Sequence, residues 1–251
     1  MIIPADRLAE EPYASVICYP RSSPDDIRKR TEELRVLGVD SIEFSGTTPA
    51  LSLPVLGKGY MGVVVIARVN GERLALKVLR VDSIRENMDH ESKMLAMANT
   101  VGVGPRLTAA TEHFILMQLI GGDEIEDWLS SENDGIVVRD VLRNVLEHCF
   151  RLDEISMDHG ELRRAPKHIL VDDDNIPYMV DFETASTHRN ASNVTSMCHF
   201  LFKSDGISKK LIDGVLGERD WEKMIPALKI YRKQRDRRSF DELLELCLSV
   251  K

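Results

Sequence analysis

The chain lacks long apolar runs, paired cysteine motifs and an excess of basic residues. No stretch approaches the roughly 18 apolar residues of a membrane-spanning helix, so we expect neither a signal peptide nor a membrane anchor. The four cysteines are far apart and form no Cys-x-x-Cys pair, which argues against a zinc ribbon or a disulfide framework and favours a reducing, cytoplasmic setting. The formal net charge of −8 argues against a polycation that coats nucleic acid.

The composition is that of an ordinary globular protein. Hydrophobic residues make up 43% and charged residues 29% of the 251 residues, and no repeat or low-complexity tract is visible. These values exclude disordered and fibrous classes. Strand-like segments come early and helical segments late, which predicts an α+β fold.

The first 48 residues predict a β-α-β extension. Residues 14–18 form a short apolar run that favours a strand, and residues 41–44 favour a second strand. Between them, Ser23-Pro24-Asp25-Asp26 is typical of a helix start, and Gly38 of a helix end. Glycine, threonine and proline in residues 45–49 indicate a connection, so we place a domain boundary near residue 48.

The following segment, residues 49–120, is rich in predicted strands. Apolar-rich runs at residues 63–69 and 73–79 flank Asn70-Gly71, which is a strong hairpin signal. We expect a helix over about residues 83–99 and a strand over residues 114–120 after this hairpin.

The remainder, residues 121–251, is predicted to be mostly helical. Apolar residues at helical spacing indicate a long helix over residues 137–155. A polar loop, a hairpin over residues 169–180 and further helices should follow. We therefore expect three parts, at residues 1–48, 49–120 and 121–251.

A glycine-rich segment offers the sharpest functional signal. Residues 57–62 read Gly-Lys-Gly-Tyr-Met-Gly and are followed by strand-like residues, whereas a dinucleotide fold would begin a helix directly after its glycines. Glycines in a hairpin let backbone amides approach phosphate groups closely. An ordinary glycine-rich hairpin is the alternative.

Lys77, in Ala75-Leu76-Lys77-Val78, is a second candidate for phosphate binding because a lysine can contact phosphate oxygens as a point charge. Glu91 is the only charged member of the apolar helical stripe that contains Ile84, Met88, Leu95 and Ala98. Burying a lone carboxylate is costly unless it is paired, so we expect an ion pair between Glu91 and Lys77. The alternative is that Glu91 reaches water at the rim of the stripe.

Two later segments contain candidate catalytic groups. The loop after the long helix reads Asp158-His159-Gly160-Glu161 and is followed by His168, and the run Asp181-Phe182-Glu183 ends an apolar strand. A carboxylate at the end of a strand suits Mg²⁺, a hard cation that binds oxygen ligands. Taken alone, Glu161 or His168 would more often be a surface or capping residue.

In their order along the chain, the glycine segment, Lys77, Glu91, the Glu161 loop and Asp181 resemble protein kinases over about residues 51–202. The resemblance is closest to small RIO-like and archaeal predicted serine/threonine kinases. It implies a bilobal kinase-like fold, with a β-rich small lobe and a reduced, mostly helical large lobe. ATP and Mg²⁺ or Mn²⁺ would be the cofactors.

The resemblance also implies roles for individual residues. Lys77 would orient the phosphates and Glu91 would hold Lys77, while Glu161 stands at the position of the aspartate that aligns the attacked hydroxyl. His168 stands where the family has a metal-binding asparagine, so the implied metal ligands are Asp181, His168 and Glu183. The implied nucleotide-binding residues are Gly57, Gly59, Gly62, Val64, Ala75 and Lys77, with Met117, Gln118 and Ile120 at the hinge that meets adenine.

The expected activity is transfer of the γ-phosphoryl group of ATP to a protein hydroxyl, its own included, although the resemblance names no particular protein substrate. The alternatives are a nucleotide-binding pseudokinase or ATPase switch within a complex, and a small-molecule kinase resembling aminoglycoside phosphotransferases. RNA contact is a further expectation, through a basic run beside Tyr231 for which a solvated helix end is the alternative. The run contains Arg232, Lys233, Arg235, Arg237 and Arg238.

Overall fold

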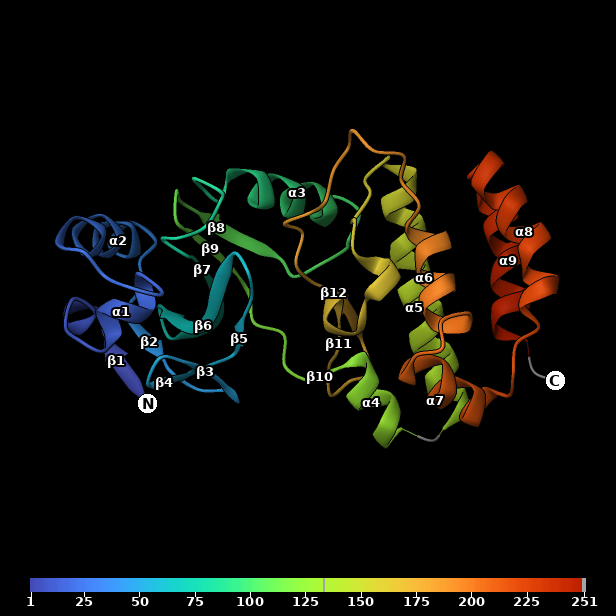
Figure 1. The fold of residues 1–251 in the computed structure, drawn as a ribbon, viewed down its shortest axis with the longest axis horizontal. Helices are drawn as coiled ribbons and strands as arrows, with labels where there is room; N and C mark the ends of the chain where they lie inside the picture. The colour runs from blue at the N-terminus through green and yellow to red at the C-terminus, as the bar shows by residue number, and fades with distance from the viewer. Residues whose placement is uncertain (133, 250–251) are drawn as a thin grey trace. The chain divides into compact units, whose positions relative to one another are not determined.

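The computed structural model describes residues 1–132 and 134–249 and has the predicted mixed α+β architecture with antiparallel sheets (Figure 1). The chain forms two compact units. Unit 1 consists of Met1–Ala96 and Pro105–Leu119, and unit 2 of Met97–Gly104 and Ile120–Lys251. Among the helices of the described residues, none is long and apolar enough to cross a bilayer.

Unit 1 is built on an antiparallel sheet in which seven strands take part. Its strands pair in the order β1-β2-β6-β7-β9-β8, and β5 pairs with β6 beside this path. The strands are β1 (Ile2–Pro4), β2 (Ser41–Glu43), β5 (Gly57–Lys58), β6 (Gly62–Val69), β7 (Glu72–Leu79), β8 (Leu107–Ala110) and β9 (Phe114–Gln118). Two short strands, β3 (Thr48–Ala50) and β4 (Leu53–Val55), form a separate hairpin.

The predicted central hairpin is confirmed. Strands β6 and β7 pair antiparallel from Gly62 opposite Leu79 to Val69 opposite Glu72. The turn residues Asn70 and Gly71 both have positive φ, at 51° and 82°. Two positive φ angles are the requirement of the tight turn that matches strand twist, which explains why Asn-Gly occurs here.

The first predicted strand of the N-terminal segment is wrong. Residues 14–18 lie largely in a short helix, α1 (Tyr13–Ile17), and the first strand is instead β1. A short apolar run does not distinguish a strand from a buried helical turn, because both bury such side chains. The predicted helix is confirmed as α2 (Pro24–Val36), whose N-cap Ser23 accepts a hydrogen bond from the amide of Asp26.

The N-terminal segment covers one face of the sheet of unit 1. Strand β2 pairs with β6, and Val16 and Leu34 of the two helices belong to the same buried cluster as Leu76 and Leu116 of the sheet. Buried Arg30 strengthens this contact, because its Nη1 donates to the carbonyl oxygens of Ile17 (2.7 Å) and Leu79 (2.6 Å). Residues 1–48 therefore share a core with the strands that follow them.

The helix predicted over residues 83–99 begins later than expected, as α3 (Asp89–Asn99). The hydroxyl of Ser83 accepts the amide of Arg85, and the carboxamide oxygen of Asn87 accepts the amide of Asp89. These local hydrogen bonds hold residues 83–88 out of the helix. Ile84 is consequently 89% exposed and does not belong to the apolar stripe.

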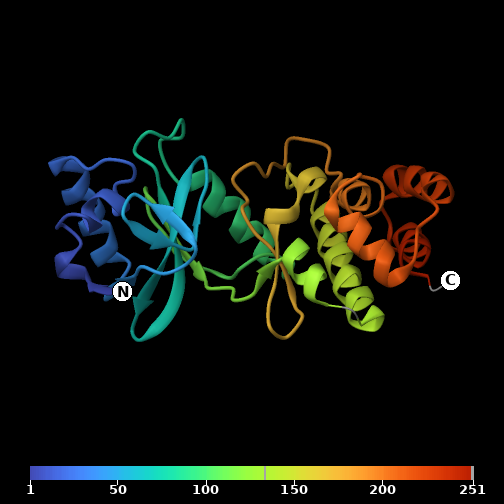
Figure 2. The same ribbon diagram turned by 60° about the horizontal axis from the view of Figure 1, so that its bottom comes forward.

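Unit 2 is mostly helical. The predicted long helix is confirmed as α5 (Gly135–Glu154), with Asp134 as its N-cap, and the predicted hairpin is confirmed as β11 and β12. Helices α8 and α9 pack against each other, α8 against α6 and α9 against α5 (Figures 1 and 2). The remaining elements are β10 (Asp123–Glu124), α4 (Ile125–Ser131), η2 (Leu162–Arg164), η3 (Pro166–His168), β11 (Ile169–Val171), β12 (Pro177–Met179), α6 (Asn193–Phe202), α7 (Ile207–Leu216), α8 (Trp221–Gln234) and α9 (Arg237–Leu248).

Candidate functional site

The candidate site residues of unit 1 begin with an ion pair between β7 and α3. The Nζ atom of Lys77 lies 2.7 Å from Oε1 of Glu91, and each side chain is only 8% exposed. The expected pair is thus present and largely removed from water. At this burial the attraction between the charges is poorly screened, so each side chain depends strongly on the other.

Register places further candidate residues beside Lys77. Val64 of β6 is opposite Lys77, and Met117 of β9 is opposite Ala75. Directly opposed residues of antiparallel strands, and residues two apart in one strand, point to the same face. Val64, Ala75, Lys77 and Met117 therefore share the sheet face opposite the one that the N-terminal helices cover.

The glycine segment forms a tight hairpin next to this face. Gly57 is opposite Val64, and the amide of Gly59 donates to the carbonyl oxygen of Gly62 (2.8 Å). A Cβ atom at Gly62 would lie 2.8 Å from the carbonyl oxygen of Val78 and 3.4 Å from Cε of Lys77. Packing thus requires glycine at position 62, and the Lys77 side chain runs directly past it.

The other two glycines of the hairpin have no such packing constraint. A Cβ atom at Gly57 would meet nothing within 4 Å, and one at Gly59 would meet only the carbonyl oxygen of Gly62 at 3.9 Å. Neither residue has a positive φ. There is therefore open space beside the Cα atoms of Gly57 and Gly59, while the amide of Gly59 is engaged by Gly62.

The predicted hinge residues follow at the end of β9. Gln118 ends the strand, and its amide donates to the carbonyl oxygen of Arg106 (2.8 Å), so this amide is engaged within unit 1. Ile120 is the first residue of the second segment of unit 2. The strand predicted over residues 114–120 is therefore two residues shorter than expected.

In unit 2, the structure brings together two residues to which the sequence assigned separate roles. Nε2 of His168 lies 2.8 Å from Oε2 of Glu161. The His168 side chain is 13% exposed and that of Glu161 is 40% exposed. Glu161 lies directly before η2 and His168 ends η3, so two short helical turns set the separation of these side chains.

A buried hydrogen-bond network anchors the start of this loop. The carboxamide of Asn193 accepts the amide of His159 (2.9 Å) and donates to Oδ1 of Asp153 (2.8 Å) and to the carbonyl oxygen of Met157 (2.6 Å). Oδ2 of Asp153 accepts the hydroxyl of Tyr231 (2.8 Å). Burial raises the pKa of Asp153, although these hydrogen bonds oppose the shift.

Sequence reasoning missed this network. Asp153 lies four residues after Cys149 and therefore on the buried face of α5, so a carboxylate at the end of an apolar stripe was the available signal. Nothing in the local pattern around Asn193 or Tyr231 indicated its partner.

His159 is fully buried beneath the loop. Its Nε2 lies 3.2 Å from the carbonyl oxygen of Val180, and its ring centroid lies 5.6 Å from that of His168 in an edge-on arrangement. Burial lowers the pKa of His159 to about 4, so this ring is neutral at pH 7. Gly160 has φ of 95°, and a Cβ atom there would lie 2.7 Å from Oγ1 of Thr184, so only glycine fits.

Asp181 has an unusual backbone conformation. Its φ of 69° is in the left-handed region, where residues other than glycine are strained. Strain of this kind, about 1–3 kcal/mol, often marks functional positions. Phe182, which follows, is buried, and Glu183 is partly buried. The amide of Val180 donates to the carbonyl oxygen of His168 (3.0 Å), which links the two loops of unit 2.

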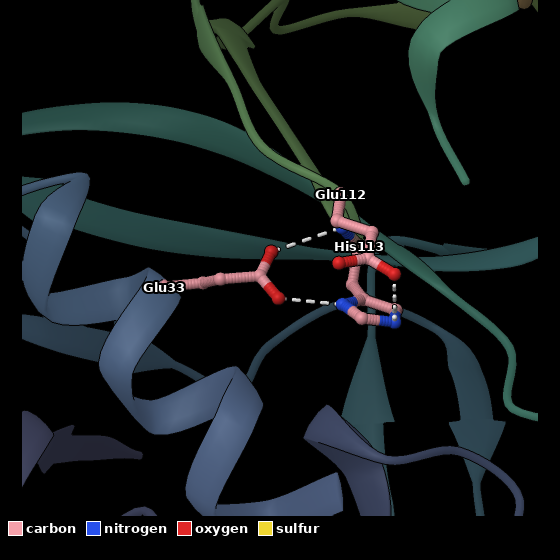
Figure 3. Close-up of side chains that lie close together, drawn as sticks. All are labelled: Glu33, Glu112 and His113. Carbon is pink, nitrogen blue, oxygen red and sulfur yellow. Dashed lines mark hydrogen bonds and ion pairs between the residues drawn. The ribbon is translucent and has the colours of Figure 1, made fainter.

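A further charged group in unit 1 joins α2 to the turn between β8 and β9 (Figure 3). Glu33 contacts His113 twice, with Oε1 2.5 Å from Nδ1 and Oε2 accepting the backbone amide at 2.9 Å. Oε1 of Glu112 lies 3.8 Å from the other ring nitrogen. Burial acts to raise the pKa of Glu33, but hydrogen bonds from His113 outweigh it and lower the pKa. This group attaches the N-terminal segment to the sheet.

Three of the five residues of the basic run form contacts within unit 2. Arg235 donates to the carbonyl oxygen of Ala191, Arg237 pairs with Glu147 and Asp241, and Arg238 pairs with Glu242. Tyr231 is buried and therefore offers no exposed ring for base stacking.

Comparisons with known proteins add no relative: no protein-family model and no curated protein matches the chain.

Proposed function

We propose that this protein is an ATP-dependent serine/threonine protein kinase of the atypical, RIO-like type. In this proposal the fold is bilobal and kinase-like, with unit 1 as the small lobe and unit 2 as a reduced, mostly helical large lobe. The first 48 residues are an extension of the small lobe. The reaction transfers the γ-phosphoryl group of ATP to a protein hydroxyl with Mg²⁺ or Mn²⁺.

The buried ion pair between Lys77 and Glu91 carries the proposal. A buried ion pair contributes little net stability, because well-packed apolar residues in its place are often as stable or more stable. Its presence on a sheet face beside a glycine hairpin therefore favours a functional reason. A lysine whose side chain runs past Gly62, in the same sheet as the hairpin that contains Gly57 and Gly59, is suited to bind phosphate oxygens.

The groups of unit 2 suit the other half of the reaction. The Glu161 carboxylate would align the acceptor hydroxyl, and Asp181, supplemented by Glu183, would hold the divalent cation. The hydroxyl oxygen bonds to the γ-phosphorus, the bond from that phosphorus to the bridging oxygen breaks, ADP leaves, and the hydroxyl proton passes to the Glu161 carboxylate and then to water. Catalysis of this type consists mainly of positioning and charge neutralisation.

Transfer of label from γ-³²P-ATP to the protein itself and to generic protein substrates, with Mg²⁺ or Mn²⁺, tests the activity. We expect labelling by the wild type, loss in Lys77→Ala and Glu161→Gln, and no change in Lys93→Ala, a matched control because the Lys93 side chain is 72% exposed on α3. Failure to label the protein, generic substrates or a cell extract would refute the kinase. Release of phosphate without labelled protein would favour an ATPase switch, and a labelled small molecule would favour the third alternative.

Calorimetry of ATP binding tests the metal role. We expect Mn²⁺ to increase the affinity of the wild type for ATP and Asp181→Asn to abolish that increase. Equal affinities with and without the ion, unchanged by the substitution, would remove Asp181 from the proposal. The double variant Lys77→Met/Asp181→Asn then measures whether both residues act on one nucleotide, since effects on a shared ligand are not additive.

A further inference from the structure

Helices α6 and α8 of unit 2 enclose a small apolar hollow between them (Figure 1). The floor of this α6–α8 hollow is formed by Ile225, which is partly buried, and by Leu228, which is 6% exposed. Thr195 of α6 lines it from the other side, and the exposed residues Lys229 and Arg232 form its rim. The hollow therefore combines an apolar floor with a cationic rim.

The size of the α6–α8 hollow limits what can enter it. Its volume is about 130 Å³. Sites for cofactors and drug-sized ligands have about 300–1,000 Å³, whereas a cavity of about 150 Å³ holds a benzene ring. The hollow is therefore too small for a nucleotide, and its size suits a single aliphatic side chain.

An aromatic contact borders the hollow at one end. His199 lies one helical turn after Thr195 on α6, and its ring meets that of Trp221 edge-on, with centroids 6.0 Å apart. On α8, Trp221 lies one turn before Ile225, while Arg232 comes after the apolar floor. The face of α8 toward α6 thus leads from an aromatic contact over apolar residues to a cation.

The charge of the cationic rim is not neutralised by the described part of the chain. The side chains of Lys229 and Arg232 form no ion pair or hydrogen bond with another described residue, in contrast to three other arginines of the basic run. The described residues that line the hollow include no acidic one. Burial, Arg163 and Lys203 lower the pKa of His199, so further cations lie near the aromatic end. The surroundings of the hollow therefore favour an anionic partner.

We propose that the α6–α8 hollow is a docking site for an acidic segment of a partner protein, which inserts one aliphatic side chain onto the apolar floor and places carboxylates beside Lys229 and Arg232. An anchor side chain in a small recess provides much of the affinity of such a contact, and rim charges provide selectivity and faster association. Nucleic acid fits less well, because stacked bases need exposed aromatic rings, whereas Tyr231 is buried and Trp221 packs against His199. This docking site does not depend on the proposed phosphoryl transfer.

A random peptide library displayed on phage tests the chemistry of the occupant without assuming its sequence. Peptides are selected on the full-length wild type after depletion on Lys229→Glu/Arg232→Glu, the rim variant, which reverses two charges at exposed positions. We expect the enriched peptides to combine one leucine, isoleucine or methionine with neighbouring aspartates or glutamates. No enrichment, or enrichment of basic or uncharged polar peptides, would overturn the proposal.

Fluorescence anisotropy with an enriched peptide then measures what each part contributes. We expect the rim variant to bind about tenfold more weakly and to lose the sensitivity to salt, because attraction at the rim becomes repulsion. Thr195→Phe fills the hollow and keeps both charges, so it should weaken binding about tenfold or more. The control Lys29→Glu/Lys210→Glu makes the same change in charge at exposed lysines outside the hollow and should match the wild type.

Other results would assign the surface differently. Wild-type affinity in Thr195→Phe would exclude an inserted side chain, and wild-type affinity in the rim variant would exclude carboxylates at the rim. The rim variant changes only exposed positions, so it stays decisive if circular dichroism shows that Thr195→Phe is unfolded. Tighter binding of labelled oligouridine than of the peptide, lost in the rim variant, would assign the surface to RNA. Self-association in sedimentation velocity that the rim variant abolishes would assign it to a second copy. Each of these results overturns the proposal, whether or not the protein transfers phosphate.

Discussion

Removing the carboxylate of Glu91 should strongly destabilise unit 1. Both side chains of the Lys77–Glu91 pair are 8% exposed, so Glu91→Leu removes a carboxylate that lies 2.7 Å from a cation with little access to water. Removing one partner of a buried pair costs about 3–5 kcal/mol, which lowers the folded-to-unfolded ratio by roughly two to four orders of magnitude. The double variant Lys77→Met/Glu91→Leu, which removes both charges, should lose about 1 kcal/mol or less, or even gain stability.

Hydrogen exchange with mass spectrometry is the suitable assay, because it measures the free energy of opening for individual peptides. Peptides of β7 and of residues 89–96 of α3 report unit 1 directly, whereas both tryptophans, Trp128 and Trp221, lie in unit 2. The control is Glu32→Leu, which breaks an exposed pair with Arg35 on α2 and should leave these peptides unchanged.

The decisive quantity is the coupling energy between the two substitutions. A coupling of about 2 kcal/mol or more would support a desolvated pair. If Glu91→Leu and the double variant had the same free energy of opening, the charge of Lys77 would not require Glu91 in the folded state. The ion pair would then no longer support the phosphate-binding proposal.

Three further results follow from the described contacts. Gly62→Ala should lower the urea midpoint of unfolding, because its Cβ would lie 2.8 Å from the carbonyl oxygen of Val78. Gly57→Ala should leave the urea midpoint unchanged and weaken ATP binding. Equal urea midpoints for the two variants would contradict this prediction. Burial lowers the pKa of His159 to about 4, so its contribution to the free energy of unfolding should be complete above pH 6.5. This free energy should fall by roughly 3 kcal/mol as the pH drops to 4. In His159→Gln the free energy of unfolding should depend less on pH if the imidazole ring is the cause. Asn193→Ala should lower the unfolding free energy by about 2–4 kcal/mol, because it leaves several buried groups unpaired; a loss below 1 kcal/mol would show that water replaces the amide.

Local signals in the sequence predicted much of the fold. The Asn70-Gly71 turn, the Ser23 cap of α2 and the apolar stripe of α5 each depend on residues within a few positions of one another, and all three elements formed as expected. The predicted start of α3 was wrong because polar side chains before the helix also bond to nearby backbone amides. The side chains of Ser83 and Asn87 accept the backbone amides of Arg85 and Asp89, and α3 begins only at Asp89.

In the candidate site, too, one contact was predicted from the sequence and another was not. Lys77 and Glu91 were paired from the sequence because a charge within a buried stripe requires a partner, although Ile84, used to define that stripe, is exposed. In contrast, Glu161 and His168 were assigned separate roles, and the close contact between their side chains became visible only in the structure.

What the sequence alone determined is therefore local: turn chemistry, caps, apolar periodicity and the need of a buried charge for a counterion. These features follow from backbone sterics and from solvation within a few residues. The tertiary structure decided which distant groups satisfy one another, as with Glu33 and His113, 80 residues apart, or Asp153 and Asn193. Such pairs depend on how separate elements pack, because a buried polar group bonds to whatever donor or acceptor the fold brings within reach.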